Sequence, residues 1–233
     1  MASTYRPVDA LDYVKAMCSN TNIDTPFARE HILDDVNKYM WMYAPWRWTI
    51  GSFPLVTLVA STTDYTVVIP SDFLYLIYSY VTDGSAPDRV LKVEPALPTT
   101  VGVVGQPSKV AVTGTTLRVS PKPGTVLPTT QVITSLYKIT APLITHETMY
   151  TAGVQIFDDE WFWVYQEGCL WKAYLYAHDF NKAGGVITDG SGKQQYTGQY
   201  GSFMAALEMM SSREKIPTFD DRNVQDPPSI RNR

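Results

Sequence analysis

Apolar residues recur at helical spacing near the start of the chain. After Asp9 they fall three or four positions apart, which predicts a first helix with Asp9 as its N-cap. Thr25 and Pro26 are a typical N-cap and first helical residue, and the apolar stripe that follows them ends before Pro45. The two stripes therefore predict a short α-hairpin.

Helical spacing returns in the last third of the chain, where residues 161–180 predict one long helix with two apolar faces. A helix that is apolar on two faces is expected to be buried twice, once by its own subunit and once by another molecule. Glycine inside a helix costs about 1 kcal/mol relative to alanine, so Gly168 predicts the close approach of another helix. We interpret one face as a subunit interface, made of Trp161, Val164, Gly168, Trp171 and Leu175.

Glycines are frequent in residues 181–201, which predicts a flexible loop before a last helix over residues 201–213.

Between the helical segments, residues 46–147 contain short apolar runs separated by turn-forming residues. Asp83-Gly84 and Thr113-Gly114 are the clearest hairpin turns. This pattern predicts six or seven short strands in a small antiparallel β-sandwich or barrel. The predicted strands are residues 55–60, 65–69, 73–81, 89–93, 109–112, 116–119 and 131–139.

The order of these elements predicts an α+β fold with a discontinuous helical domain. Residues 1–45 and 148–213 form a helical bundle, and residues 46–147 form a β lobe inserted between them. Residues 214–233 contain three prolines, both charge signs and few apolar residues, so they cannot bury enough surface to fold alone. They are either a disordered end or an extended tail that orders on a partner.

The composition is rich in apolar residues and poor in charge. The chain is 45% hydrophobic, 12% aromatic and 18% charged, against about 25% charged residues in an average soluble domain. Extra aromatic residues are typical of protein interfaces and also of a tyrosine-rich β core. A net charge of -4 with no long run of Lys or Arg argues against a protein that grips nucleic-acid backbones.

Cys18 and Cys169 each lie in an apolar helical pattern, which predicts buried free thiols rather than a disulfide or metal site. Asp9 and Asp12 interrupt any signal-peptide core, and no apolar run approaches the roughly 20 residues of a membrane span. The sequence therefore predicts a soluble protein made in a reducing compartment.

Few residues suggest chemistry. The acidic run at Asp158, Asp159 and Glu160 could serve a hydrolase or a metal ion, but acids at a helix start more often cap it. The histidines are scattered, no serine lies in a Gly-x-Ser-x-Gly context, and Gly-Ser-Gly-Lys at 190–193 lacks the spacing of a phosphate-binding loop. We predict no catalytic, cofactor-binding or metal site, and therefore no enzyme.

Several short motifs occur in a recognisable order. A Trp-x-Trp leads into strands, Ile-Pro-Ser-Asp-Phe stands at residues 69–73, Gly-Gln-Pro-Ser precedes a hairpin at 105–108, and "LRVSPKPG" is followed later by "DDEWFWVYQEGCLWKAYLYAHD". In this order, over most of the chain, the motifs resemble the head-to-tail connector (adaptor) proteins of tailed bacteriophages, particularly short-tailed ones. The Gly-rich segment 181–201 departs from the family pattern.

The resemblance implies a structural protein of the virion neck, made in the host cytoplasm. Family members form a ring, typically a homododecamer, beneath the portal protein, and genomic DNA passes through the channel without sequence-specific contact. Downstream tail, nozzle or fibre proteins would attach to the β lobe. The tail would dock on the portal through Ile216, Phe219, Arg222, Val224, Ile230, Arg231 and Arg233. The first alternative is a β-rich tail or receptor-binding module. A cell-wall hydrolase is a less favoured alternative.

Overall fold

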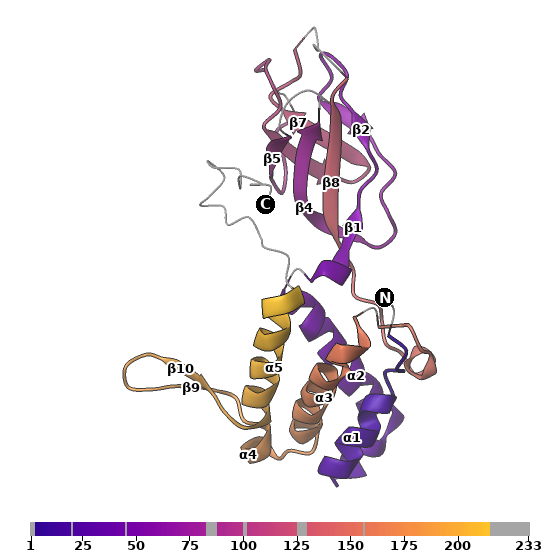
Figure 1. The fold of residues 1–233 in the computed structure, drawn as a ribbon, viewed down its shortest axis with the longest axis vertical. Helices are drawn as coiled ribbons and strands as arrows, with labels where there is room; N and C mark the ends of the chain where they lie inside the picture. The colour runs from indigo at the N-terminus through magenta and orange to yellow at the C-terminus, as the bar shows by residue number, and fades with distance from the viewer. Residues whose placement is uncertain are drawn as a thin grey trace, which may run out of the picture. The chain divides into compact units, whose positions relative to one another are not determined.

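The computed structural model describes residues 3–19, 21–44, 46–82, 88–99, 102–124, 130–155 and 157–214. The fold is mixed α+β, and the chain divides into two compact units (Figure 1). The helical unit contains the described residues up to Thr49 and from Ala141 onward, and the β unit contains Ile50–Thr140.

The β unit is thus shorter than the 46–147 expected from the sequence. Trp46 and Trp48 belong to the helical core, where their rings stack with centroids 5.8 Å apart. The Trp46 indole donates to the Met40 carbonyl at the end of the second helix. These aromatic residues, which the sequence places at the start of the β lobe, therefore belong to the helical unit instead.

In the described residues of the helical unit there are five α-helices: α1 (Asp9–Met17), α2 (Pro26–Tyr43), α3 (Phe162–Tyr176), α4 (Phe180–Ala183) and α5 (Gly198–Glu214). Short 3-10 turns lie at Thr21–Asp24, Arg47–Thr49, Thr148–Tyr150 and Asp159–Trp161. The cap of α2 is confirmed, since the Thr25 hydroxyl accepts from the Ala28 amide at 3.1 Å.

The predicted cap of α1 was wrong. Val8 occupies the N-cap position without a side-chain cap, and Asp9 lies inside the first turn. The Asp9 carboxylate instead accepts hydrogen bonds from the Arg6 amide at 2.8 Å and the Arg6 guanidinium at 2.6 Å.

The expected long helix over residues 161–180 is also divided. His178 has a φ of 59°, in the left-handed region, which ends α3 before α4 begins at Phe180. The amides of His178 and Asp179 bond back to the carbonyls of Leu175 and Tyr174 at 3.1 and 2.9 Å. These bonds satisfy carbonyls at the helix end, as in a glycine-type C-cap.

The predicted loop over residues 181–201 is instead an ordered hairpin of β9 (Val186–Thr188) and β10 (Gln194–Tyr196), followed at once by α5. The Asp189 carboxylate organises its turn by accepting from the amides of Ser191 and Lys193 at 2.9 and 3.0 Å. At the base, a Cβ on Gly184 would lie 1.9 Å from the Thr197 carbonyl oxygen. At that position glycine permits a close backbone approach rather than flexibility.

Helix α3 is the centre of the helical core and packs on α1, α2 and α5. A Cβ on Gly168 would lie 2.5 Å from Val36 on α2 and 2.8 Å from Phe203 on α5. The close helix approach that Gly168 predicted is therefore present, and two helices make it. Cys18 and Cys169 are buried free thiols, as expected.

The β unit is one curled sheet in the order β1-β8-β4-β5-β6-β7-β3, with β2 also beside β8. Its strands are β1 (Ile50–Ser52), β2 (Val56–Thr57), β3 (Asp64–Thr66), β4 (Phe73–Thr82), β5 (Arg89–Val93), β6 (Lys109–Thr113), β7 (Thr116–Ser120) and β8 (Val132–Ile139). The hairpin turn at Thr113-Gly114 is confirmed, with a Gly114 φ of 56°. The Asp83-Gly84 turn lies outside the described residues.

An all-antiparallel sheet was expected, but β5 and β6 pair in parallel. Residues 94–108 connect them, which is long enough for the crossover of a dozen or more residues that parallel pairing needs. A separate hydrophobic core fills the inside of the curl, with contributions from Val56, Tyr65, Leu76, Leu91, Val110, Leu117 and Ile133.

The Gly168 contact gives a first prediction. Gly168→Val should destabilise the protein by about 1–3 kcal/mol, because the new side chain overpacks the junction of α2, α3 and α5. Urea unfolding measures the difference. Gly185→Val is the matched control, since a Cβ there has no heavy atom within 4 Å. Equal stability of the two variants would contradict this account of the core.

Candidate assembly surfaces

The five predicted interface residues of α3 do not share one exposed face. Trp161, Val164 and Gly168 are buried inside their own unit, while Trp171 and Leu175 are partly exposed. The two apolar faces of α3 are covered by α1, α2 and α5 of the same chain, so the pattern alone does not require a second molecule. Partly exposed apolar surface remains on α3 at Trp171 and Leu175.

Trp171 belongs to an aromatic cluster at the surface of the helical unit. Its ring lies 4.9 Å from that of Tyr200 and 5.7 Å from that of Tyr39, centroid to centroid. The hydroxyls of Tyr39 and Tyr200 are hydrogen-bonded at 3.0 Å. Burial is the main cause that raises the pKa of the Tyr39 hydroxyl, and the hydrogen bond to Tyr200 raises it further.

An open groove of about 520 Å³ adjoins this cluster, lined by Asp35, Lys38, Tyr39, Met42, Tyr43 and Lys172. Met42 is 64% exposed. At the same surface, Lys172 forms an ion pair with Asp35 at 3.1 Å. We name Trp171, Leu175 and the residues lining this groove the aromatic face. Sequence reasoning missed the groove, because Met42 lies outside the apolar stripe of α2.

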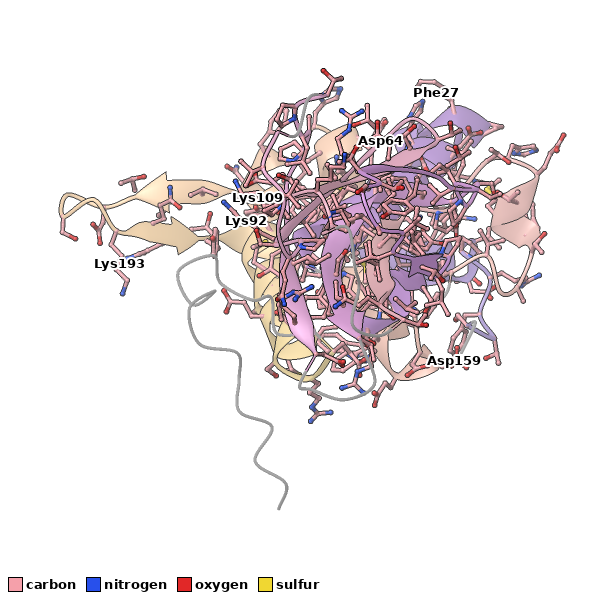
Figure 2. The ribbon with its side chains drawn as sticks, turned by 90° about the horizontal axis from the view of Figure 1, so that it is seen from above. Phe27, Asp64, Lys92, Lys109, Asp159 and Lys193 are labelled. Carbon is pink, nitrogen blue, oxygen red and sulfur yellow. The ribbon has the colours of Figure 1, made fainter. Side chains whose placement is uncertain are left out.

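The β9–β10 hairpin is a second exposed surface. All six of its strand residues are exposed, and Val186 and Ile187 are about half exposed. It projects from the helical unit beside α5 (Figure 1), and Lys193 lies near its far end (Figure 2). A two-stranded hairpin without a covered face is only marginally stable by itself.

The acidic run has a structural role at Asp159. Its carboxylate accepts from the Ser3 hydroxyl and the Thr4 amide, each at 2.8 Å, and from the Thr4 hydroxyl. Bonds from the Thr4 and Ser3 hydroxyls lower the pKa of Asp159 below its usual value of 3.8. Asp159 therefore anchors the N-terminal segment rather than capping a helix.

Asp158 occupies the N-cap position of the 3-10 turn but makes no capping hydrogen bond with its side chain. Carboxylate oxygens of Asp158, Glu160 and Glu214 lie within 4.8 Å of one another. This is the only group of three potential metal ligands within the described part of the chain, and exposed acids commonly gather without an ion.

The three histidines lie in different segments of the chain, each beside a different aromatic ring: His31 with Phe27, His146 with Tyr150 and His178 with Phe180.

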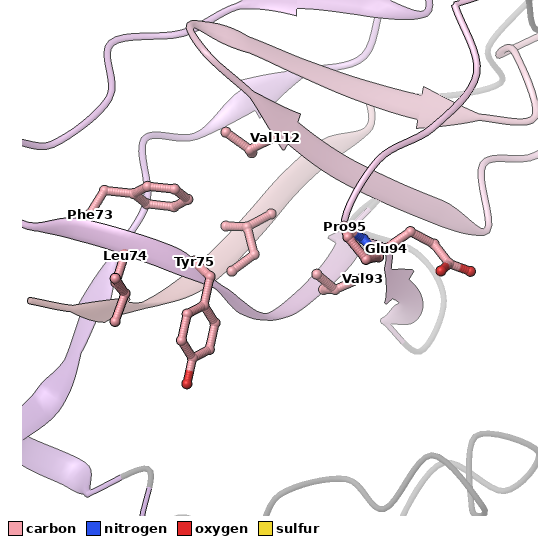
Figure 3. A pocket seen from close by; sticks show the side chains of 8 residues that line it. Phe73, Leu74, Tyr75, Val93, Glu94, Pro95 and Val112 are labelled. Atoms are coloured by element: carbon pink, nitrogen blue, oxygen red, sulfur yellow. The ribbon is translucent and has the colours of Figure 1, made fainter. Parts of the chain in front are cut away.

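The β unit contains a hollow of about 450 Å³ where β4 and β5 separate. Phe73, Leu74 and Tyr75 border it on β4, and Val93, Glu94 and Pro95 border it on the other side (Figure 3). Leu76 and Val112 complete its lining. We name it the β4–β5 wedge.

Two lysines contact Glu94, one of the residues that line the wedge. Lys92 and Lys109 are labelled in Figure 2. They lie 3.2 and 3.5 Å from the same oxygen of Glu94, and their side chains are 49% and 48% exposed. Two lysines therefore share one carboxylate. Together, Lys92, Lys109 and Glu94 carry a formal net charge of +1. Hydrogen bonding to Lys92 is the first cause that lowers the pKa of Glu94.

The seven predicted portal-binding residues of the tail, from Ile216 to Arg233, lie outside the described residues. Within the described part of the chain, no helix is both long and apolar enough to cross a membrane.

A helical unit interrupted by a curled sheet, with exposed apolar surfaces on both units, fits a class of structural assembly proteins. The family model of the SU10 adaptor protein matches residues 32–225. Because the match covers most of the chain, the protein belongs to the SU10 adaptor protein family of phage adaptors. Among curated proteins, none matches the chain.

Asp159 gives a second prediction. Its folded-state pKa is lowered, so its contribution to stability is present above the unfolded pKa of 3.8 and is lost as the pH falls through the folded pKa. Asp159→Asn should therefore be less stable than the native chain at pH 7, and the gap should shrink below about pH 3.8. Urea unfolding across this range measures it, and a gap independent of pH would contradict the assignment.

Proposed function

We propose that the protein is a head-to-tail adaptor, or connector, of a tailed bacteriophage, specifically a short-tailed one. It assembles as a ring of twelve copies beneath the portal protein, extends the DNA channel and supplies the platform to which tail, nozzle or fibre proteins attach. Membership in the SU10 adaptor protein family is the observation that carries the proposal. The same membership supports a structural rather than an enzymatic role in the virion.

The proposed architecture follows the division of the chain. The helices act as a bundle that lies beside its neighbours in the ring, and the curled sheet acts as the small sandwich-like or barrel-like lobe that meets tail components. The C-terminal residues act as an extended tail that docks on the portal through Ile216, Phe219, Arg222, Val224, Ile230, Arg231 and Arg233. An adaptor at this position belongs to the virion neck.

A closed ring needs a head-to-tail contact, in which one surface of each copy meets a different surface of the next. The aromatic face is our candidate for one of these surfaces. It combines partly exposed Trp171 and Leu175 with the exposed side chain of Met42, and aromatic residues and methionine are enriched at protein interfaces. Trp161, Val164 and Gly168 would support this face from inside the unit.

The portal interaction gives a third prediction. Mixed with its portal protein, the full-length chain should form a ring on the portal, whereas a chain ending at Glu214 should not, because it lacks the docking tail. Mass measurement of each mixture distinguishes these species. A full-length chain that stays monomeric or trimeric and does not bind the portal protein would overturn the adaptor proposal. That result would favour a tail or receptor-binding module.

The aromatic face gives a fourth prediction. Met42→Asp should prevent ring formation on the portal while leaving the unfolding transition of the isolated chain almost unchanged, because Met42 is 64% exposed. Val103→Asp is the control, at a residue of similar exposure, 68%, in the β unit. Rings of normal mass from Met42→Asp would exclude this part of the aromatic face from the subunit contact.

A further inference from the structure

The β4–β5 wedge arises because β4 has a strand partner on only one side over part of its length. Strand β4 pairs with β8 from Phe73 to Thr82, but with β5 only at Ser79–Val81. Beyond Leu91, β5 turns to pair with β6 through Lys92 and Val93. Among the described residues, no strand pairs with Phe73–Leu76 on the side of β4 that faces β5.

The shape and chemistry of the wedge select an extended peptide. An unpaired strand edge offers main-chain groups to an added strand, and pockets beside it select the alternate side chains. The side chains that line the wedge are apolar apart from Tyr75 and Glu94. The excess positive charge of Lys92 and Lys109 over Glu94 favours an acidic residue beside the apolar one.

The chain itself contains a segment with this chemistry. Residues 216–221 read Ile-Pro-Thr-Phe-Asp-Asp, just after the end of α5. Pro217 favours an extended conformation at Ile216. Alternate residues of a strand share a face, so Phe219 and Asp221 would point the same way, about 7 Å apart. No other part of residues 215–233 places an aromatic residue before consecutive acids.

We propose that residues 216–221 of this chain dock in the β4–β5 wedge as an added strand. Phe219 packs among the apolar side chains of the wedge, and Asp221 faces Lys92 and Lys109. This docking goes beyond the proposed adaptor role. It would hold residues 216–221 on a β unit when no portal protein is bound. Since the portal proposal uses Ile216 and Phe219 too, the portal and the wedge compete for them.

The test uses the full-length chain with the photoreactive aromatic residue p-benzoylphenylalanine in place of Phe219. Irradiation should cross-link it to residues 73–76 or 93–95, mapped by peptide mass spectrometry. The same residue in place of Val224 is the positional control and should give about tenfold less of this product. The mass of the product shows whether the docked segment comes from the same chain or from a second copy.

Charge variants make the test specific. Asp221→Asn, and separately Lys92→Glu with Lys109→Glu, should lower the cross-link yield about two- to fivefold, as expected for exposed ion pairs. Asp220→Asn is the matched control, because alternation along the proposed strand would put Asp220 on the opposite face from Phe219 and Asp221. It should leave the yield unchanged.

Cross-links confined to other parts of the chain, no cross-link, or equal effects of the two Asn substitutions would overturn the docking proposal. These outcomes do not depend on ring formation, so the docking and the adaptor role can fail separately. Added portal protein should lower the yield if both proposals hold.

Discussion

The fold depends on how α2 holds the chain where it returns from the β unit. Asp34 and Asn37 are polar residues of α2 that are 7% and 1% exposed. The Asp34 carboxylate accepts from the Ile144 amide at 3.0 Å, and the Asn37 amide donates to the Pro142 carbonyl at 2.8 Å. Burying these groups unpaired would cost about 1–3 kcal/mol each, so the returning segment is held in one register on α2.

That register positions the rest of the helical unit. Ile144 and Met149 enter the core beside α2, and the chain then reaches α3, whose Tyr165 hydroxyl donates to the Leu33 carbonyl at 2.9 Å. Gly168 lets α3 approach both α2 and α5. The insertion of residues 50–140 is therefore compatible with one continuous helical core, because specific polar contacts with α2 fix the point at which the chain returns.

The sequence predicted strands and helices well where local chemistry decides them. The limits of β5 were predicted to the residue, and the cap of α2 follows from Thr25 and Pro26. The predictions were wrong where contacts beyond the local hydrophobic pattern determine the conformation of the chain. His178 adopts a left-handed conformation that its residue type only weakly favours, and the Gly-rich segment folds because Asp189 organises its turn. Neither feature appears in hydrophobic periodicity.

The candidate surfaces were harder to predict than the fold. Periodicity marks a side chain as apolar but does not say which element covers it, so Trp161 and Val164 looked like interface residues and are core residues. The wedge had no sequence signal, because it depends on β5 leaving β4 for a parallel pairing with β6. Only the sheet topology reveals an edge that a further strand can use. A β unit that keeps such an edge can gain a partner strand without changing its own core.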